Sequence, residues 1–396
     1  MKVLVIHNRY IELGGEDQIV DSEIELLKKH GHDVVLYERF NSEIFKFGPW
    51  RKIFFLLSEM RWSKKTYNDI RQLVKNIKPD IAHIHNIFYL ITPAVYISLY
   101  KEGVPIVQTL HNYRWFCPNA TFYRAGKICE KCFKNKYFFA LRNRCLKQSF
   151  LYTLALVRVL KFIEHIVRIK KIIKVFVCLT DFSKNKFSYF GIPEKEIVVK
   201  PNFCFDLSKN ENDFPKDKQK YAIFVGRLVD YKGVNTLVRA NKKFPGIQLK
   251  IVGDGPLDCK LKKEVRRISY VQLLGRRPHE TTLDMIRNAS FLIFASECYE
   301  NMPSVIIESF SCGTPVLATN IGAIKEIIQD GVNGLLFSVG DSEDLFRKIR
   351  YLSGNNELLS ILGSNARETY KKRFTPELNY QSLLEIYGRA IETGNN

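Results

Sequence analysis

The stretch ECYENMPSVIIESFSCGTPV, residues 297–316, places two glutamates eight positions apart around the start of an apolar helix pattern. Pro303 suits the first turn of a helix, so Glu300 is predicted to precede that helix and Glu308 to lie inside it. An ionised glutamate in the buried sequence VIIESF needs a partner, because a desolvated carboxylate is costly. Paired hydroxyls, such as those of a ribose, would serve as one. The alternative is that both glutamates are ordinary exposed carboxylates.

Two motifs upstream also follow predicted strands. GRLVDYKGV (226–234) places Arg227 after a glycine that ends a strand and Lys232 at the start of a helix. Two cations near a helix N-terminus favour an anion such as a diphosphate, although surface cations without a ligand are the alternative. In IVGDGP (251–256), Gly253 would let a ligand approach the backbone closely, but glycines at such junctions also serve purely conformational roles.

Apolar, β-rich runs alternate with amphipathic helical patterns along the whole chain, which predicts parallel sheets with helices on both faces. The predicted strands of the first half are 2–7, 32–37, 80–85, 105–111, 174–180 and 196–202. Those of the second half are 221–226, 247–253, 270–275, 290–295, 314–319 and 333–338. A polar segment with turn-forming residues, 202–220, is predicted to link the two halves.

This alternation predicts an α/β protein of two doubly wound domains that face a central cleft, where ligands bind beyond the carboxyl ends of the strands. We expect an N-terminal domain at 1–200, with a cysteine-containing insertion at about 113–145, and a C-terminal domain at 201–375. Residues 376–396 are expected to form a helix that packs back toward the N-terminal domain.

Taken together, the motifs resemble those of a known family. E-x7-E from Glu300 to Glu308, followed by S-F-S-C-G-T-P-V and preceded by G-R-L-x3-K-G, is similar to the retaining nucleotide-sugar glycosyltransferases of family 4, of the bacterial polysaccharide type. GGED (14–17) after the first strand and QTLHN (108–112) at the end of the fourth agree with this resemblance. It spans nearly the whole chain and implies the GT-B fold, which consists of two Rossmann-like domains.

The resemblance also implies roles for individual residues. Arg227 and Lys232 would bind the donor diphosphate and steady the leaving group. Glu308 would take the ribose hydroxyls, Glu300 would contact the donor sugar near the reacting carbon, and His111 would line the sugar pocket. Further implied donor-binding residues are Gly14, Gly15, Gly253, Arg276, Asn301, Met302 and Ser304.

The implied chemistry needs fixed positive charge more than a metal. Breaking the sugar–phosphate bond develops negative charge on the diphosphate, which cations and a helix dipole can stabilise. No D-x-D motif appears in the predicted strands, and no paired carboxylates of the kind used by retaining glycosidases are evident. The resemblance implies metal-independent, same-face transfer from UDP- or GDP-hexose. Where the family commonly has E-G-F-G-L-P, this chain has E-N-M-P-S-V, and Pro303 has no N–H to donate.

Four cysteines cluster in the predicted insertion. Cys117, Cys129, Cys132 and Cys145 supply four thiols, including one C-x2-C pair of the kind found in structural zinc sites. Packed or redox-labile thiols are the alternative to zinc. The remaining five cysteines occur singly in apolar or small-residue contexts and are expected to pack in the core: Cys178, Cys204, Cys259, Cys298 and Cys312.

The net charge of +20 favours an anionic partner, and residues 114–174 carry 15 basic against 2 acidic residues. Within this segment, 147–176 has apolar residues at helical spacing with basic residues between them. This pattern predicts a core-facing helix that also presents a face to an anionic membrane.

No RNA-binding motif is present, so nucleic acid is not an expected partner. MKVLVIHN has no secretion-signal pattern, and no apolar run is long enough to span a membrane.

We therefore expect a cytoplasmic enzyme, peripheral at the inner face of the plasma membrane. It would transfer a hexose to a lipid-linked glycan acceptor in cell-surface polysaccharide synthesis. The alternatives are a nucleotide-sugar epimerase, a glycan phosphorylase of GT-B fold, or a zinc-stabilised RNA-binding protein. A phosphorylase would carry a pyridoxal lysine motif, which is not found, and an RNA-binding role leaves the paired glutamates and cations unexplained.

Overall fold

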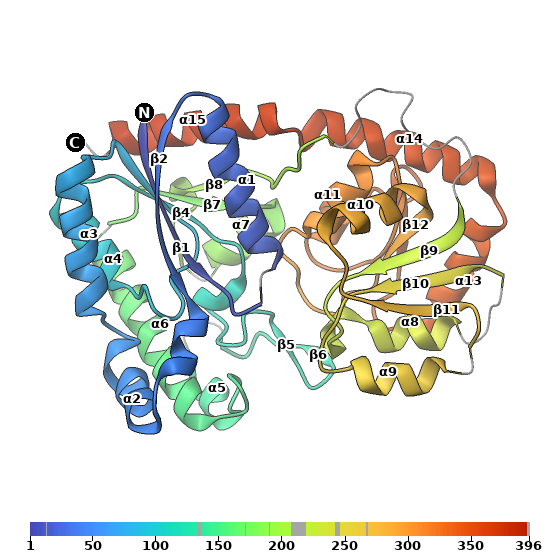
Figure 1. Ribbon diagram of the computed structural model, residues 1–396, viewed down its shortest axis with the longest axis horizontal. Helices are drawn as coiled ribbons and strands as arrows, with labels where there is room; N and C mark the ends of the chain where they lie inside the picture. Colours follow the sequence, from blue (N-terminus) through green and yellow to red (C-terminus); the bar gives the residue numbers. More distant parts are fainter. Residues whose placement is uncertain are drawn as a thin grey trace. The chain divides into compact units, whose positions relative to one another are not determined.

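The computed structural model describes residues 1–12, 14–132, 136–170, 172–189, 191–206, 219–241, 246–266 and 268–393 (Figure 1). The chain divides into two compact units. Unit 1 comprises residues 1–122, 129–201 and 376–396, and unit 2 comprises residues 123–128 and 202–375.

Unit 1 is built on a six-stranded parallel sheet with the strand order β2-β1-β3-β4-β7-β8. Its strands are β1 (Lys2–Arg9), β2 (Asp33–Phe40), β3 (Ile81–Ile84), β4 (Ile106–Thr109), β7 (Val175–Cys178) and β8 (Ile197–Val199). β1, β3, β4 and β7 are almost wholly buried, because helices cover both faces of a parallel sheet. Their apolar residues form the core together with residues of the first and last helices.

The helices of unit 1 surround this sheet. They are α1 (Gly15–Lys29), η1 (Asn41–Lys46), α2 (Pro49–Phe54), η2 (Phe55–Glu59), α3 (Lys64–Ile77), α4 (Ala94–Lys101), η3 (Tyr113–Trp115), α5 (Phe138–Arg142), α6 (Phe150–Lys170), α7 (Asp181–Tyr189), η5 (Glu194–Glu196) and α15 (Pro376–Glu392). α15 is the last helix of the chain, yet Leu383, Ile386 and Tyr387 are buried in the unit 1 core. Fixing these residues there ties the end of the chain to its first domain.

Unit 2 contains a second six-stranded parallel sheet, with the order β11-β10-β9-β12-β13-β14. Its strands are β9 (Gln219–Val225), β10 (Gln248–Val252), β11 (Val271–Gly275), β12 (Ala289–Phe294), β13 (Val316–Thr319) and β14 (Gly334–Phe337). This is the order of a doubly wound dinucleotide-binding fold. The chain runs outward from β9 in one direction and from β12 in the other, so the order reverses between these two neighbours.

The helices of unit 2 follow the strands in alternation. They are η6 (Asp230–Lys232), α8 (Val234–Asn241), α9 (Asp258–Val265), α10 (His279–Asn288), α11 (Ser304–Ser311), α12 (Ile324–Ile327), α13 (Ser342–Ser353) and α14 (Asn356–Arg373). A short antiparallel hairpin of β5 (Tyr123–Arg124) and β6 (Lys127–Ile128) also belongs to this unit.

The predicted fold class is confirmed: each of the twelve predicted strands is present, in two doubly wound parallel sheets. Within the predicted linker at 202–220, residues 207–218 lie outside the described part of the chain. Of the five cysteines expected in the core, Cys178, Cys298 and Cys312 are buried and Cys204 is half-buried. The prediction is wrong for Cys259, which is exposed on α9. Among the described residues, no helix is both long and apolar enough to cross a membrane.

Candidate functional site

The point where the strand order reverses in unit 2 brings together residues from two loops. The β9–α8 loop contains η6 and the β12–α11 loop contains Glu300. Gly233 lets these loops meet: it has φ +71°, and a Cβ added there would lie 1.8 Å from the carbonyl oxygen of Ala295 at the end of β12. Ligands of doubly wound folds bind at this position, beyond the carboxyl ends of the strands.

Lys232 and Glu300 form the central contact of this site. Lys232 Nζ lies 2.6 Å from Glu300 Oε1, and Ser296 Oγ donates to the same oxygen at 2.7 Å. Burial opposes charge on both side chains, but each partner outweighs it, so the pKa of Lys232 is raised and that of Glu300 is lowered. Both groups are therefore ionised at neutral pH, and the ammonium group of Lys232 is fixed at the point where the strand order reverses.

Glu308 lies inside α11, as predicted, and is buried there. It accepts a hydrogen bond from His279 Nε2 at 3.1 Å. This hydrogen bond raises the pKa of His279, which begins α10 and is half exposed. The partner that the buried carboxylate requires is thus a histidine of the neighbouring helix.

A third carboxylate, Glu297, belongs to the same loop. Its Oε1 accepts from Thr236 Oγ1 at 2.7 Å, and its Oε2 accepts from the hydroxyl group of Tyr123 on the β5–β6 hairpin at 3.3 Å. The Glu297 backbone N–H donates to Tyr231 O at 2.8 Å, which fixes the β12–α11 loop against η6. Glu297 therefore orders the loop that carries Glu300.

The other residues predicted in unit 2 lie in or next to the loops that follow β9, β10, β11 and β12. Arg227 and Arg276 are exposed after β9 and β11, Asn301 and Met302 are buried, and Ser304 begins α11. Gly253 has a packing role that the sequence alone left open, because a Cβ there would lie 1.9 Å from Gly226 O. Any other residue at this position would clash with the backbone at the end of β9, so packing alone requires a glycine here.

In unit 1, His111 follows β4 and contacts a second histidine. His85 Nδ1 and His111 Nε2 are 2.8 Å apart, and the two rings are stacked with centroids 5.1 Å apart. Burial lowers the pKa of His111 to about 3, with a further contribution from the neighbouring His7. The imidazole is therefore neutral at physiological pH and offers a polar edge without a charge.

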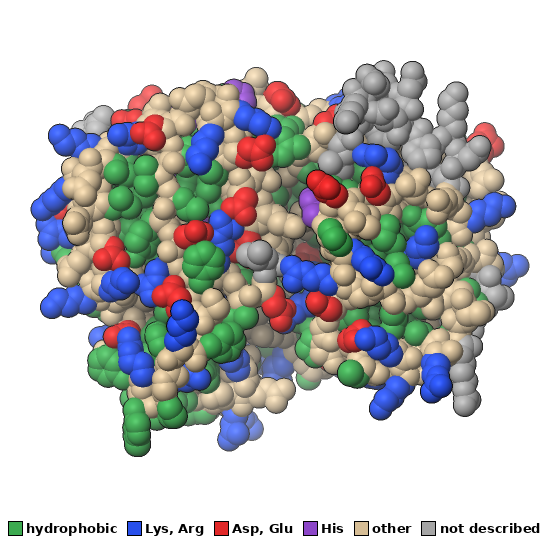
Figure 2. Space-filling view, viewed as in Figure 1, with side chains coloured by type: hydrophobic (Ala, Val, Ile, Leu, Met, Phe, Trp, Pro, Cys, Tyr) green, Lys and Arg blue, Asp and Glu red, His purple; other side chains and the backbone are tan. Residues whose placement is uncertain are grey.

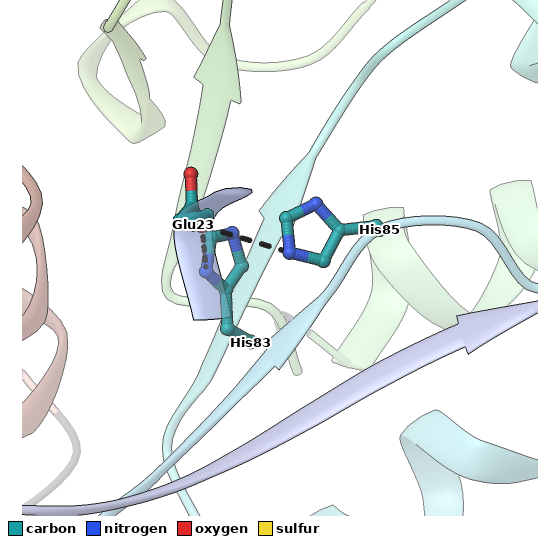
Figure 3. Close-up of side chains that lie close together, drawn as sticks. All are labelled: Glu23, His83 and His85. Carbon is teal, nitrogen blue, oxygen red and sulfur yellow. Dashed lines mark ion pairs between the residues drawn. The ribbon is translucent and has the colours of Figure 1, made fainter. Parts of the chain in front are cut away.

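His85 belongs to a buried polar cluster made of α1, β3 and the residue after β8. Glu23 Oε1 lies 3.0 Å from His83 Nδ1 and 3.6 Å from His85 Nε2, and its Oε2 accepts from Lys200 Nζ at 2.9 Å. Figure 3 shows Glu23, His83 and His85 pointing toward one another. The hydroxyl group of Tyr387 lies 2.8 Å from the same nitrogen of His83, Nδ1.

Glu23, His83 and His85 are the group among the described residues whose ligand atoms converge closely enough to hold a metal ion. Lys200 already supplies a positive charge to Glu23 and makes a second hydrogen bond to Asn379 Oδ1 at 3.0 Å. Burial raises and the lysine lowers the pKa of Glu23, with a net shift well below its ordinary value. The cluster is therefore charge-balanced by protein groups alone.

Gly14 caps α1, and Gly15 is the first residue of that helix. The Gly14 N–H donates to Asp17 Oδ2 at 2.9 Å, while Asp17 Oδ1 lies 2.8 Å from His7 Nε2. A Cβ added to Gly14 would meet no atom within 4 Å, so the space beside it is open. Among the described residues, leaving aside its chain neighbours, none therefore crowds the position beside Gly14, although acidic residues stand in the first helical turn.

The four cysteines of the insertion are thiols, and two of them are buried. Burial raises the pKa of Cys117 to about 11 and that of Cys132 to about 12, with smaller contributions from the neighbouring cysteines. Within the described residues, no three of the four sulfur atoms lie within 4.8 Å of one another. Sulfur atoms around one zinc ion lie closer than this, so the structure does not form a closed zinc site.

The basic segment predicted as a membrane face is mostly α6. Its apolar residues pack inward: Ala155, Leu156, Val157, Val159, Leu160 and Ile163 are all buried. The side chains of 166–170 lie outside the described part of the chain. The core-facing half of the prediction therefore holds for these six residues, whereas Phe150 at the start of the helix is exposed, and the membrane face stays a prediction.

Several residues of the site were missed by the sequence analysis. His279 was missed because its partner Glu308 lies 29 positions away, and Thr236 and Tyr123 give no signal of their own. The cluster around Glu23 had one sequence signal, the two histidines of DIAHIH in an otherwise buried strand. Polar residues with a period of two in a core strand indicate a buried network.

Comparisons with known proteins match both halves of the chain. Residues 13–204 match the family described as Glycosyltransferase Family 4, and residues 207–369 match Glycosyl transferases group 1. An uncharacterized glycosyltransferase of Methanocaldococcus jannaschii is 26% identical over 400 residues, covering 98% of each chain. The lipopolysaccharide core biosynthesis glycosyltransferase LpsE of Rhizobium meliloti is 28% identical over 222 residues, which cover 53% of this chain and 63% of that protein.

Solved structures give the same fold. The crystal structure of HepE from Anabaena in complex with UDP-glucose aligns with a TM-score of 0.67 at 17% identity, covering 97% of this chain and 98% of that one. The lipopolysaccharide outer core galactosyltransferase WaaB aligns with a TM-score of 0.63 at 15% identity, covering 99% of each chain. At these identities the likeness establishes the GT-B architecture and nothing about substrates.

Proposed function

Because the chain belongs to the retaining nucleotide-sugar glycosyltransferases of family 4, we propose that it transfers a hexose from UDP- or GDP-hexose to a glycan acceptor. The acceptor we propose is lipid-linked, and the product is a cell-surface polysaccharide. Two relatives whose names refer to lipopolysaccharide synthesis favour this class of acceptor.

The observation that carries the proposal is the pair of Lys232 and Glu300 at the reversal point of the unit 2 sheet. A donor diphosphate that binds beside Lys232 meets a fixed ammonium group, and the negative charge that develops on the leaving group is stabilised there. Glu300 keeps this ammonium group charged and in place. In our proposal it also contacts the donor sugar near the reacting carbon.

The remaining roles follow from position. Glu308 accepts hydrogen bonds from the ribose hydroxyls, which replace its hydrogen bond from His279. Arg227 adds a second positive charge to the diphosphate site. His111 presents a neutral imidazole to the sugar. UDP is the nucleotide we propose to test first, since the Anabaena protein of the same fold was solved with UDP-glucose.

Thermal-shift measurements test the donor assignment. We expect UDP to raise the unfolding midpoint of the purified protein more than GDP or ADP, because a ligand that binds only the folded state stabilises it. A panel of UDP-hexoses then identifies the sugar. A protein that responds to none of the three nucleotides would contradict the assignment of the unit 2 site.

A transfer assay tests the reaction itself. The preferred UDP-hexose is incubated with lipid-linked glycan acceptors in the presence of EDTA, and the anomeric configuration of the product is read by NMR. Turnover that survives EDTA and retains the donor configuration supports metal-independent, retaining transfer. Inversion of configuration, or loss of activity that added Mg²⁺ restores, would contradict it.

A further inference from the structure

The helix formed by α2 and η2 exposes an apolar face to solvent. Trp50, Ile53, Phe54 and Leu57 are spaced i, i+3, i+4 and i+7, which places them on one side of a helix. All four are exposed, and Trp50 is 84% exposed. Phe55 and Leu56 lie on the opposite side of this helix and are buried. Core packing therefore explains the apolar residues of that side but not the four exposed ones.

A second group of exposed aromatic residues lies around α5 and the start of α6. Phe138 is 67% exposed, and Phe139 and Phe150 are also exposed. α6 contacts both α5 and η2, and all of these elements lie at one end of unit 1 (Figure 1). We call residues 45–57 and 138–150 together the aromatic end.

The aromatic end concentrates exposed apolar surface to an unusual degree. Eighteen large hydrophobic side chains are exposed among the described residues, and eight of them fall within these two segments of 13 residues each. The eight are Phe45, Trp50, Ile53, Phe54, Leu57, Phe138, Phe139 and Phe150. Figure 2 shows hydrophobic side chains gathered at this end of unit 1 with Lys and Arg side chains beside them. Single exposed apolar residues need no explanation, but a gathered patch of this kind marks an interaction surface.

Positive charge surrounds this patch. Residues 46–65 contain six Lys or Arg and one acidic residue, Glu59, which is paired with Arg51 at 2.6 Å. Residues 136–150 contain four Lys or Arg and no acidic residue. Exposed Trp and Phe with a rim of cations is the composition of surfaces that lie in the interface of an anionic bilayer.

The patch is held in place by packing against α6. Arg158 on α6 donates to Leu57 O at 2.9 Å, and the rings of Trp62 and Phe162 meet edge-on at 6.1 Å. Residues Ala155 to Leu160 of α6 are mostly buried, so this part of the helix supports the aromatic end, whereas Phe150 at its start belongs to the exposed face. The exposed face is thus presented on a fixed scaffold.

We propose that the aromatic end docks on an anionic lipid bilayer. Trp50, Phe54 and Phe138 enter the interface between headgroups and acyl chains, and the surrounding Lys and Arg side chains contact lipid phosphates. The proposal names the surface through which the enzyme would reach a lipid-linked acceptor. Only the access to a lipid-linked acceptor rests on the proposed function. Docking on the bilayer does not require the transfer reaction.

Vesicle sedimentation tests the docking surface. The full chain is mixed with phosphatidylcholine vesicles with or without phosphatidylglycerol. We expect binding to the anionic vesicles that weakens as salt is added, because surface charges are screened. Trp50→Ala together with Phe54→Ala should weaken this binding by about tenfold or more. Equal binding to both vesicle types, or unchanged binding by the double variant, would overturn the proposal.

Matched controls come from unit 2. Tyr351 and Ile361 are exposed to 56% and 51%, so Tyr351→Ala with Ile361→Ala removes exposed apolar surface of a similar kind elsewhere. This control variant should bind anionic vesicles as the natural protein does. The thermal midpoint and UDP binding of the Trp50 and Phe54 double variant should be unchanged, which separates a docking defect from failure to fold and from failure of the proposed function.

Tryptophan emission gives an independent measurement. Trp115 is buried and Trp62 is half-buried, so Trp50 is the exposed one of the three tryptophans. Anionic vesicles should shift the emission to shorter wavelength and protect it from acrylamide quenching, and Trp50→Phe should remove both effects. Concentration-dependent self-association that Trp50→Ala abolishes, without any response to vesicles, would assign the surface to a second copy of the chain and overturn the proposal.

Discussion

Lys232 and Glu300 lie 68 positions apart in the sequence, and their charged groups are 2.6 Å apart in the structure. Their loops follow β9 and β12, the two neighbouring strands between which the order of the sheet reverses. Ser296 donates to the same carboxylate oxygen, so two donors hold Glu300 in place. Glu300 in turn holds the ammonium group of Lys232. The position of the ammonium group is therefore set by the fold, which is what the electrostatic role that we propose for Lys232 requires.

Lys232→Ala is expected to lower kcat/KM by about 10²–10³-fold, because one fixed group that stabilises developing negative charge typically contributes that much. Steady-state kinetics with the preferred donor measures this loss. Lys262→Ala is the control, since Lys262 forms an exposed pair with Asp258 on α9 and should not affect turnover. Turnover close to that of the natural protein in Lys232→Ala would refute the assignment of the diphosphate site.

The same pair predicts a coupling in stability. Lys232→Met leaves the largely buried Glu300 carboxylate without its cation, so the free energy of unfolding should fall by about 1–3 kcal/mol at pH 7. Adding Glu300→Gln to that variant should recover much of the loss, because the uncompensated charge is gone. Urea unfolding of both single variants and the double variant measures the coupling energy, and strictly additive effects would contradict it.

The sequence predicted the strands because their signal is local. Each strand is a short apolar run between turn residues, so its identity does not depend on distant parts of the chain. Contacts such as Glu308 with His279 depend on which helices become neighbours, and a single histidine carries no sign of this. Trp50 was missed for a related reason: its spacing with Phe54 and Leu57 is that of an ordinary core helix. Only the fold shows which side of that helix is exposed.

The pairing of His279 with Glu308 predicts that nucleotide binding depends on pH. The hydrogen bond to Glu308 raises the pKa of His279, so the histidine is protonated and holds the carboxylate more tightly below that pKa. The ribose hydroxyls of a nucleotide would compete with His279 for Glu308. The nucleotide should therefore bind more tightly as the pH rises through the pKa of His279. Calorimetric titration of UDP from pH 6 to pH 8.5 should show tighter binding at the higher pH.

His279→Gln tests the origin of this pH dependence. Glutamine can still donate to Glu308 but does not titrate, so the dependence of UDP affinity on pH should flatten. His165→Gln provides a control on α6, which belongs to unit 1. If the His279→Gln variant retains the full slope, another group controls binding and the proposed exchange at Glu308 is wrong.

The cysteines of the insertion are expected to differ from Cys259 in reactivity. Burial raises the pKa of Cys117 to about 11 and that of Cys132 to about 12, so both are protonated and shielded at neutral pH. Cys259 is exposed and should react first with a maleimide reagent, whereas Cys117 and Cys132 should react after unfolding. Mass spectrometry of labelled peptides measures the order. Metal analysis that finds one zinc ion per chain would instead establish the zinc site that the sequence predicts.

The buried pair of Lys200 and Glu23 predicts a large effect on stability. Both side chains are almost fully buried and lie 2.9 Å apart, so Lys200→Met leaves an uncompensated carboxylate in the core. Breaking a buried pair in this way costs about 3–5 kcal/mol. Lys200→Met with Glu23→Gln should lose less than Lys200→Met alone, and urea unfolding at pH 7 compares them.

The histidines beside this pair give the stability of unit 1 a defined dependence on pH. Burial lowers the pKa of His85 well below its ordinary value and that of His111 to about 3, so an unfolded chain binds protons that the folded chain does not as the pH falls below about 6.5. The lowered pKa of Glu23 acts in the same direction at still lower pH. The free energy of unfolding should therefore fall between pH 7 and pH 5, and His111→Gln should reduce that fall. Equal slopes in the natural protein and the variant would show that His111 takes up a proton in the folded state and is not held neutral by the cluster.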